Sequence, residues 1–375
     1  MTLEAVLALA VEMKASDVHL TADLPPLVRV DGELVRLEGH AALTGAEIER
    51  LLDRYLTDHQ KRLFEETSEL DFSVGVRDVA RLRVNLFRQR GQVAAVLRLI
   101  PDQIPVLREL GLPAVVETLV RIPRGLVLVT GPTGSGKTTT LAAIIDQINS
   151  ERRGHILTIE DPIEYVHTHK KSIVNQRELH GDTRGFAPAL RAALREDPDV
   201  VLIGEMRDYE TVEMALHIAE TGHLTLATLH TNSAVQTIHR IVDLFPARQQ
   251  GQVRAQLSLI LQGIVCQILI PLAEGRGRVP AAEVLIPTSG VRHLIREDKL
   301  HQVYSAMQAA KDAVGMQTMN QSLASLYHRR MITLDDAVGY SSNRDELRDM
   351  IARRRGGRGA GRTAAPSELV GGSGR

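Results

Sequence analysis

The sequence predicts an α/β protein with two domains, and three observations support this prediction. A length of 375 residues is typical of two domains with extensions. Short alternating strands dominate residues 1–100, whereas strands alternate with helices from about residue 114. The later strands are short, apolar and separated by helices, which is typical of a mainly parallel sheet.

Residues 1–100 are expected to form a small mixed α/β domain. Its first helix places Leu3, Val6, Leu7 and Ala10 on one face. The run LVRV-DG-ELVRL predicts a hairpin with a type I′ turn at Asp31-Gly32. Two helices should begin at the capping-box pairs Thr44 with Glu47 and Thr57 with Gln60. Three further strands are predicted at DFSVGV, ARLRVNLF and QVAAVLRLI.

Residues 101–113 contain three prolines and are interpreted as a linker. The second domain is expected over residues 114–352. Its strands are predicted at GLVLVT, HILTI, DVVLIG and LTLATLH. Helices are predicted from Thr138 and over residues 209–220, and the chain after Val253 is expected to be mostly helical.

The uncharged stretch Ala255–Ala273 could be mistaken for a membrane span. It contains four glutamine or serine residues before Pro271 and is short of clearly apolar residues for a span. We therefore expect a buried helix that ends at Pro271.

Composition excludes several classes of protein. Hydrophobic content of 43% and charged content of 24% are those of an ordinary folded protein. The single cysteine, Cys266, excludes a disulfide framework and a four-cysteine zinc site. The segment Met1–Lys14 lacks a long apolar core, so we do not expect it to be a signal peptide. We therefore expect a reducing, cytoplasmic location.

Charge is unevenly spread along the chain. Residues 353–375 carry a net charge of +5 and are expected to form a disordered Arg/Gly tail, which leaves a net charge of −6 for residues 1–352. Aromatic residues make up only 3% of the chain. An acidic body with few stacking side chains argues against direct binding of nucleic acid.

The segment GPTGSGKT at residues 131–138 has the pattern of a phosphate-binding loop between a strand and a helix. Its glycines let backbone N–H groups point at phosphate oxygens. In this pattern Lys137 contacts the outer phosphates and the Thr138 hydroxyl is a magnesium ligand.

Acidic residues follow two of the predicted strands. ILTI is followed by Glu160-Asp161-Pro162-Ile163-Glu164, and VVLI by Gly204-Glu205. Carboxylates at the carboxyl ends of strands lie where open α/β sheets bind ligands. One carboxylate of this kind can hold Mg²⁺ while another orients the attacking water. The alternative for such acids is helix capping or solvent exposure.

Arginine and histidine residues add candidate cationic groups. Arg191 and Arg195 are four apart on a helical stretch, and Arg81, Arg83 and Arg98 occupy polar strand positions of the first domain. Four of these arginines could supply positive charge for phosphoryl transfer or be ion-paired on the surface, namely Arg81, Arg83, Arg191 and Arg195. His230, at a strand end, has two open interpretations: a sensor of the γ-phosphate or a structural histidine.

Together these motifs resemble the secretion ATPase superfamily and, within it, the type IV pilus retraction ATPases (the PilT family). The resemblance runs from about Leu3 to residue 350. It is carried by ASDVHL, GPTGSGKTTTLAA, TIEDPIEYVH, LREDPDVVLIGEMRD and TGHLTLATLHTNSA. Residues 290–297, GVRHLIRE, keep five of the eight letters of the family's retraction motif AIRNLIRE.

The resemblance implies a PAS-like N-terminal domain joined to a RecA-like ATPase domain with a helical C-terminal part. Glu205 would bind Mg²⁺ with Thr138, Glu164 would activate water, and His230 would belong to the catalytic site with Lys137. The implied ATP-binding residues are Gly131, Pro132, Thr133, Gly134, Ser135, Gly136, Lys137, Thr138 and Thr139. The arginines implied to act across a subunit interface are Arg81, Arg83, Arg98, Arg191 and Arg195.

The resemblance also implies a homohexamer at the inner face of the cytoplasmic membrane that hydrolyses ATP and powers pilus retraction. Its implied partners are an inner-membrane platform protein, the pilus extension ATPase and an accessory retraction ATPase, without zinc. Alternative functions are a DNA-processing or secretion-type motor of the same superfamily, or an accessory retraction paralogue.

Overall fold

The computed structural model describes residues 2–30, 32–76, 79–100, 103–310 and 314–356. Contacts group the chain into two compact units, Met1–Leu107 with Thr138–Ala227, and Arg108–Lys137 with Thr228–Arg375. The domain boundaries expected from the sequence stay a prediction.

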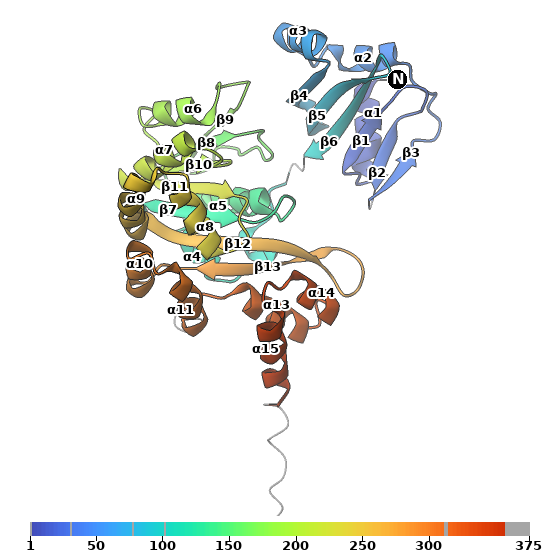
Figure 1. Cartoon of the computed structure of the whole chain (residues 1–375). Coiled ribbons are helices and arrows are strands. Elements are labelled where there is room, and N and C mark those ends of the chain that lie inside the picture. Colours follow the sequence, from blue (N-terminus) through green and yellow to red (C-terminus); the bar gives the residue numbers. More distant parts are fainter. Residues whose placement is uncertain (1, 31, 77–78, 101–102, 311–313, 357–375) are drawn as a thin grey trace, which may run out of the picture. The chain divides into compact units, whose positions relative to one another are not determined.

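The first unit contains a six-stranded antiparallel sheet in the order β3-β2-β1-β6-β5-β4 (Figure 1). Its strands are β1 Asp17–Leu20, β2 Leu27–Val30, β3 Glu33–Arg36, β4 Glu69–Val76, β5 Ala80–Gln89 and β6 Gln92–Ile100. Its helices are α1 Leu3–Glu12, α2 Gly45–Asp53 and α3 Asp58–Thr67. The predicted turn at Asp31 lies outside the described residues, although Gly32 has a φ of +91°.

Side-chain alternation explains why one face of this sheet is covered. Leu82, Val84 and Leu86 on β5 are buried in the core, whereas Arg81 and Arg83 point to the other face. Helix α1 buries the four apolar residues expected from its periodicity. Both predicted capping boxes are confirmed at the starts of α2 and α3.

The rest of the first unit is built from parallel strands and helices. Strands β8 and β9 pair in parallel, as do β8 with β10 and β10 with β11. The strands are β8 His155–Glu160, β9 Ile173–Glu178, β10 Val200–Ile203 and β11 Leu224–Leu229. The helices are α5 Lys137–Glu151, α6 Phe186–Ala193 and α7 Tyr209–Glu220. Strand β9 was not predicted from the sequence.

The second unit combines three strands with a helical C-terminal part. Strand β12 pairs in parallel with β7 and in antiparallel with β13. The strands are β7 Gly125–Thr130, β12 Leu261–Pro271 and β13 Arg278–Leu285. The helices are η1 Leu107–Leu110, α4 Val116–Leu119, α8 Ala234–Asp243, α9 Ala247–Ile260, α10 Ser289–Arg296, η2 Leu300–Gln302, α11 Val303–Ala309, α13 Met319–His328, α14 Leu334–Tyr340 and α15 Arg344–Gly356. Helices α13, α14 and α15 pack on β12 and β13 around Ile270, Leu323 and Leu347 (Figure 1).

In the first unit these strands are hydrogen-bonded in the order β11-β10-β8-β9, and in the second unit in the order β7-β12-β13. Among the described strands, six have a parallel neighbour, namely β7, β8, β9, β10, β11 and β12, whereas β13 pairs in antiparallel with β12. The predicted parallel-rich α/β fold is confirmed.

One prediction about this sheet is wrong. The stretch Ala255–Ala273 is not one helix, because α9 ends at Ile260 and Leu261–Pro271 forms strand β12. Ile264, Val265 and Ile270 are β-branched and buried between β7 and β13, so sheet packing outweighs the helical pattern. Across the described residues, no helix is long and apolar enough to cross a membrane.

Candidate functional site

The phosphate-binding loop follows the fully buried strand β7 and leads directly into α5. Gly131, Gly134 and Gly136 all have a positive φ, a backbone conformation that residues with a side chain rarely adopt. At Gly131 an added Cβ would lie 2.2 Å from the carbonyl oxygen of Gln267, so the close approach of β12 also requires glycine. The amide of Gln267 donates to Ser135 O at 2.7 Å and thereby fixes the far side of the loop.

Lys137 lies over this loop. Its Nζ donates to Gly131 O at 2.8 Å and to Pro132 O at 3.0 Å, and the residue is only 8% exposed. The Ser135 hydroxyl is buried and has no hydrogen-bond partner within the described part of the chain. A buried cation, an unsatisfied hydroxyl and a glycine backbone form a cradle that fits a phosphate chain.

The threonines after Lys137 have different surroundings. Thr138 is half-buried at the start of α5. The Thr139 hydroxyl is 3.1 Å from the Tyr165 hydroxyl, in the segment that carries Glu164. The first turn of α5 is thus tied to that segment.

Glu160 ends strand β8 and is almost completely buried, with 6% exposure. Its Oε1 accepts hydrogen bonds from the Thr158 hydroxyl at 2.7 Å and from Gln176 Nε2 at 3.1 Å. Burial, together with the charges of Glu164 and Glu178, raises the pKa of Glu160 to about 7, although the hydrogen bonds from Thr158 and Gln176 oppose the rise. Three carboxyl groups therefore share this end of β8.

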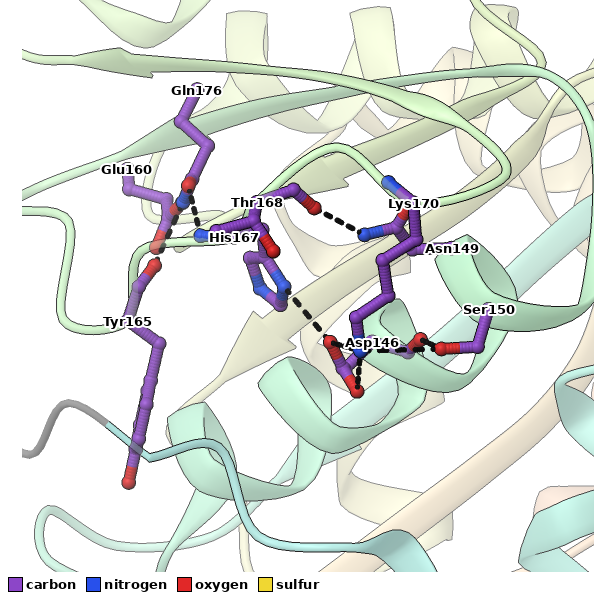
Figure 2. A network of polar contacts seen from close by, with 9 residues as sticks. All are labelled: Asp146, Asn149, Ser150, Glu160, Tyr165, His167, Thr168, Lys170 and Gln176. Atoms are coloured by element: carbon purple, nitrogen blue, oxygen red, sulfur yellow. Dashed lines mark hydrogen bonds and ion pairs between the residues drawn. The ribbon is translucent and has the colours of Figure 1, made fainter.

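Strand β9 holds the segment that carries Glu164. Figure 2 shows Gln176 between Glu160 and the segment that contains Tyr165 and His167. Gln176 donates to Tyr165 O at 2.8 Å and accepts from His167 N at 2.7 Å. Two residues further along β9, Glu178 accepts from Ile163 N at 3.0 Å.

His167 belongs to the same network of polar contacts. Its ring lies 4.0 Å from Asp146, which pairs with Lys170 (Figure 2). Burial lowers the pKa of His167 to about 4, so its ring is neutral at physiological pH.

Glu205 follows β10, where the sequence placed it. Its side chain is 18% exposed and pairs with Arg207 at 2.7 Å. The hydrogen bond and the charge of Glu205 raise the pKa of Arg207.

Two of the predicted N-terminal arginines lie opposite each other in the six-stranded sheet. Arg83 on β5 pairs with Arg98 on β6, and both side chains are exposed. Arg98 Nε donates to Asp17 at 2.9 Å. Although burial opposes ionisation, bonds from Ser16 and Arg98 hold the pKa of Asp17 below its ordinary value.

Arg81 has a different set of contacts. Its Nη2 lies 2.8 Å from Glu178 Oε2, and its Nε donates to Ile163 O at 3.3 Å. The N-terminal sheet thus contacts the segment that carries Glu164 within one unit of a single chain.

The arginines near α6 differ from expectation. Arg191 lies in α6 and is 3.5 Å from Glu210, with both side chains exposed. The helix ends at Ala193, so Arg195 lies in the following turn and not on the helix as predicted. His230 is exposed directly after β11. The catalytic roles of these residues stay predictions.

A cavity of about 890 Å³ adjoins the phosphate-binding loop in the second unit. Its lining includes residues 132–135, Leu269, Arg278, Tyr304 and Tyr340. The site also depends on residues that the sequence analysis missed, namely Gln176, Glu178 and Gln267. They act by hydrogen bonding to backbone groups that are distant in sequence, which leaves no spacing pattern.

Comparison with known proteins agrees with this geometry. Residues 1–337 match the family "Type II/IV secretion system protein". The chain is 50% identical to the type IV pilus retraction ATPase PilT of Pseudomonas aeruginosa, over 90% of this chain and 97% of the relative. It is 42% identical to the type IV pilus ATPase PilU of the same organism, over 94% and 91%. It resembles the crystal structure of the pilus retraction motor PilT with bound ADP, with a TM-score of 0.88 and 54% identity over 93% of this chain and 99% of that one.

Proposed function

The chain belongs to the type II/IV secretion system protein family, and from that membership we propose that it is the ATP-driven motor that retracts type IV pili. It is an ATPase of this family. The observation that carries the proposal is the loop between β7 and α5, in which Lys137 lies over a glycine backbone shaped for phosphates. The identity of 50% to the relative named as a pilus retraction ATPase, against 42% to the other type IV pilus ATPase, supports retraction as the function.

The residues of the site have distinct parts in the proposed reaction. Residues 131–139 bind the phosphates of ATP, and Lys137 supplies positive charge to the outer ones. The Thr138 hydroxyl and the Glu205 carboxylate are hard oxygen ligands of the type that Mg²⁺ takes, so these two would hold that ion. When bound, Mg²⁺ supplies positive charge to the β- and γ-phosphates.

Glu164 activates the attacking water in this proposal. It is half-buried, and the segment on either side of it is fixed by hydrogen bonds to β9. A base held in this way can accept a proton without reorganising at each turnover. Arg83, Arg98, Arg191, Arg195 and His230 are exposed and can contact phosphate groups from a neighbouring subunit.

The working assembly that we propose is a homohexamer at the inner face of the cytoplasmic membrane. It would turn an inner-membrane platform protein from which pilin subunits are removed, with the extension ATPase and an accessory retraction ATPase as further partners. The cavity beside residues 132–135 provides room for the nucleoside.

Steady-state turnover of the purified full-length chain with Mg²⁺ and ATP tests the enzymatic part of the proposal. Glu164→Gln keeps the shape of the side chain but removes the base, so turnover should fall by about a hundredfold or more. ATP affinity, measured by titration, should stay within about threefold because no phosphate-binding group is removed.

Glu65→Gln is the matched control, since Glu65 is exposed on α3, and it should not change turnover. Unaltered turnover in Glu164→Gln would contradict the role of the base. Turnover that rises strongly on addition of DNA would favour the DNA-processing alternative.

A further inference from the structure

Ile163, the residue directly before Glu164, is held on both of its polar backbone atoms. Its N–H donates to Glu178 Oε2 at 3.0 Å, and its carbonyl oxygen accepts from Arg81 Nε at 3.3 Å. Arg81 Nη2 also donates to Glu178 Oε2 at 2.8 Å. Arg81 and Glu178 are 97 residues apart, yet they close one hydrogen-bonded ring around this single residue.

The geometry of the peptide bond makes this contact matter for Glu164. The carbonyl of Ile163 and the Cα of Glu164 belong to the same rigid peptide plane. Arg81 therefore holds the plane from which the Glu164 side chain departs, and Glu178 holds the preceding plane. A rotation of either plane would re-aim the carboxylate.

Burial makes these contacts stronger than ordinary surface pairs. The side chain of Arg81 is 25% exposed, that of Glu178 is 17% exposed, and Ile163 is 7% exposed. Charge-assisted bonds in such surroundings are less screened by water than those of exposed pairs. The guanidinium fork can also contact a carboxylate and a carbonyl together, which lysine cannot do with the same geometry.

The other side of Glu164 is anchored differently. Gln176 binds the backbone of Tyr165 and His167 (Figure 2). It lies two residues before Glu178, and therefore on the same face of β9. Of these three anchors, Gln176 and Glu178 belong to the strand beside β8, whereas Arg81 belongs to β5 of the N-terminal sheet. Arg81 is thus the anchor that depends on where the N-terminal sheet lies.

Local charge explains why a cation is required here. Glu178 and Glu164 both act on Glu160 electrostatically, so three carboxyl groups lie within one another's field. Without Arg81, Glu178 would remain mostly buried beside like charges, and the segment would have to relax.

We propose that Arg81 is a positioning residue for Glu164. Arg81 and Glu178 together make the orientation of the catalytic base depend on docking of the N-terminal sheet onto its own chain. The proposal rests on the proposed function of Glu164. It differs from an arginine that acts directly on the nucleotide of a neighbouring subunit, because the effect of Arg81 passes through Glu178 and Ile163.

A double-mutant cycle on the full-length chain separates these two roles. Arg81→Ala and Glu178→Gln should each lower kcat by about tenfold and leave KM for ATP within about twofold, because Glu164 is misplaced but the phosphate-binding loop is intact. The kcat of the double variant should be no lower than that of the less active single variant, because the two substitutions remove the same contact between Arg81 and Glu178. Losses that multiply to about a hundredfold would show that Arg81 acts independently of Glu178 and would overturn the proposal.

Hydrogen exchange supplies a readout that does not need turnover. The Ile163 amide is protected by Glu178, and in the nucleotide-free protein it should exchange about tenfold faster in Arg81→Ala. Arg36→Ala is the matched control, since Arg36 is an exposed arginine on β3 of the same sheet, and it should leave exchange at Ile163 unchanged. Unaltered exchange in Arg81→Ala would contradict the proposal. If the wild-type chain did not hydrolyse ATP, the proposed function would be contradicted. The exchange measurement would still test whether Arg81 and Glu178 hold the Ile163 amide.

Discussion

Glu160 is the residue in which burial and charge oppose ionisation most strongly in this site. Its carboxyl group is buried at the end of β8, and its pKa is raised from 4.5 to about 7. The folded protein therefore keeps a proton on Glu160 over a pH range in which the unfolded chain has lost it. This residue gives the site a pH dependence that can be measured through stability.

Glu160→Gln should stabilise the protein at high pH. Below about pH 4.5, Glu160 is protonated in both states and costs nothing, whereas above about pH 7 the folded state must hold a buried anion. The shift in the pKa of Glu160 corresponds to a loss of about 3 kcal/mol in folding stability when the carboxyl group is ionised. The variant should therefore unfold at a higher temperature than the wild type at pH 8, with a difference that shrinks as the pH falls toward 5.

The matched measurement is thermal unfolding of both proteins at pH 5, 6, 7 and 8. Gln retains the oxygen that accepts from Thr158, so packing is preserved. If the difference in unfolding temperature between Glu160→Gln and the wild type did not change with pH, ionisation of Glu160 would not be its cause.

At the residue scale, the sequence could predict groups that work through a fixed spacing. The loop glycines, Lys137 and Glu205 lie where strand–loop–helix spacing placed them, because their chemistry depends on local backbone shape. Gln176 and Glu178 could not be found in this way. Their function depends on the pairing of β9 with β8, which joins residues far apart in no recognisable pattern.

At the scale of elements, Glu283 joins two helices to one strand. It lies on β13 with 2% exposure. One carboxylate oxygen accepts from Ala234 N at 2.7 Å and the other from Met319 N at 3.3 Å. These are the first residues of α8 and α13, whose N–H groups have no partner within the helix. Burial raises the pKa of Glu283, and the two backbone bonds oppose that rise.

Glu283→Ala should loosen both helix starts together. Loss of the carboxylate leaves two buried N–H groups unpaired, at a cost of about 2–4 kcal/mol in total. The expected result is a lower unfolding temperature and faster hydrogen exchange at both Ala234 and Met319.

Glu274→Ala, in the exposed turn between β12 and β13, is the control and should change neither quantity. Faster exchange at only one of the two amides would refute the idea that Glu283 couples α8 to α13.

Helix α10, which carries residues 290–296 of the motif-like segment, is joined to the end of α9 by an arginine. Arg292 of α10 donates to Ser258 O at 2.7 Å and to Leu259 O at 3.0 Å, which are carbonyls at the end of α9. At Gly290, where the chain departs from the family motif, there is room for a larger residue. An added Cβ would meet only Thr288 Oγ1, at 3.9 Å.

Element types were predictable where the local pattern agreed with the final packing. Helix α7 has the predicted bounds because its capping residue and apolar face agree. The prediction of one helix over Ala255–Ala273 failed because an uncharged, mostly apolar run fits a buried helix and a central strand equally. Pairing with β7 and β13 decides the outcome, and this pairing is a long-range effect.

At the scale of the whole molecule, the sequence predicted the α/β class and the ATPase family, and the comparisons confirm both. The two compact units each combine segments from separate parts of the chain. Such long-range grouping depends on strand order, which composition and periodicity do not encode. The predicted Arg/Gly tail lies outside the described residues from position 357 onward.

The central claim is that ATP hydrolysis by this chain removes pili from the cell surface. The most direct test is to count surface pili in a strain that carries Lys137→Ala at the native locus, together with surface motility. Loss of the Lys137 charge removes tight ATP binding. The account predicts more pili than in the parent strain and no twitching motility. Fewer pili would make the chain an extension motor and would contradict the account, as would an unchanged number with normal motility.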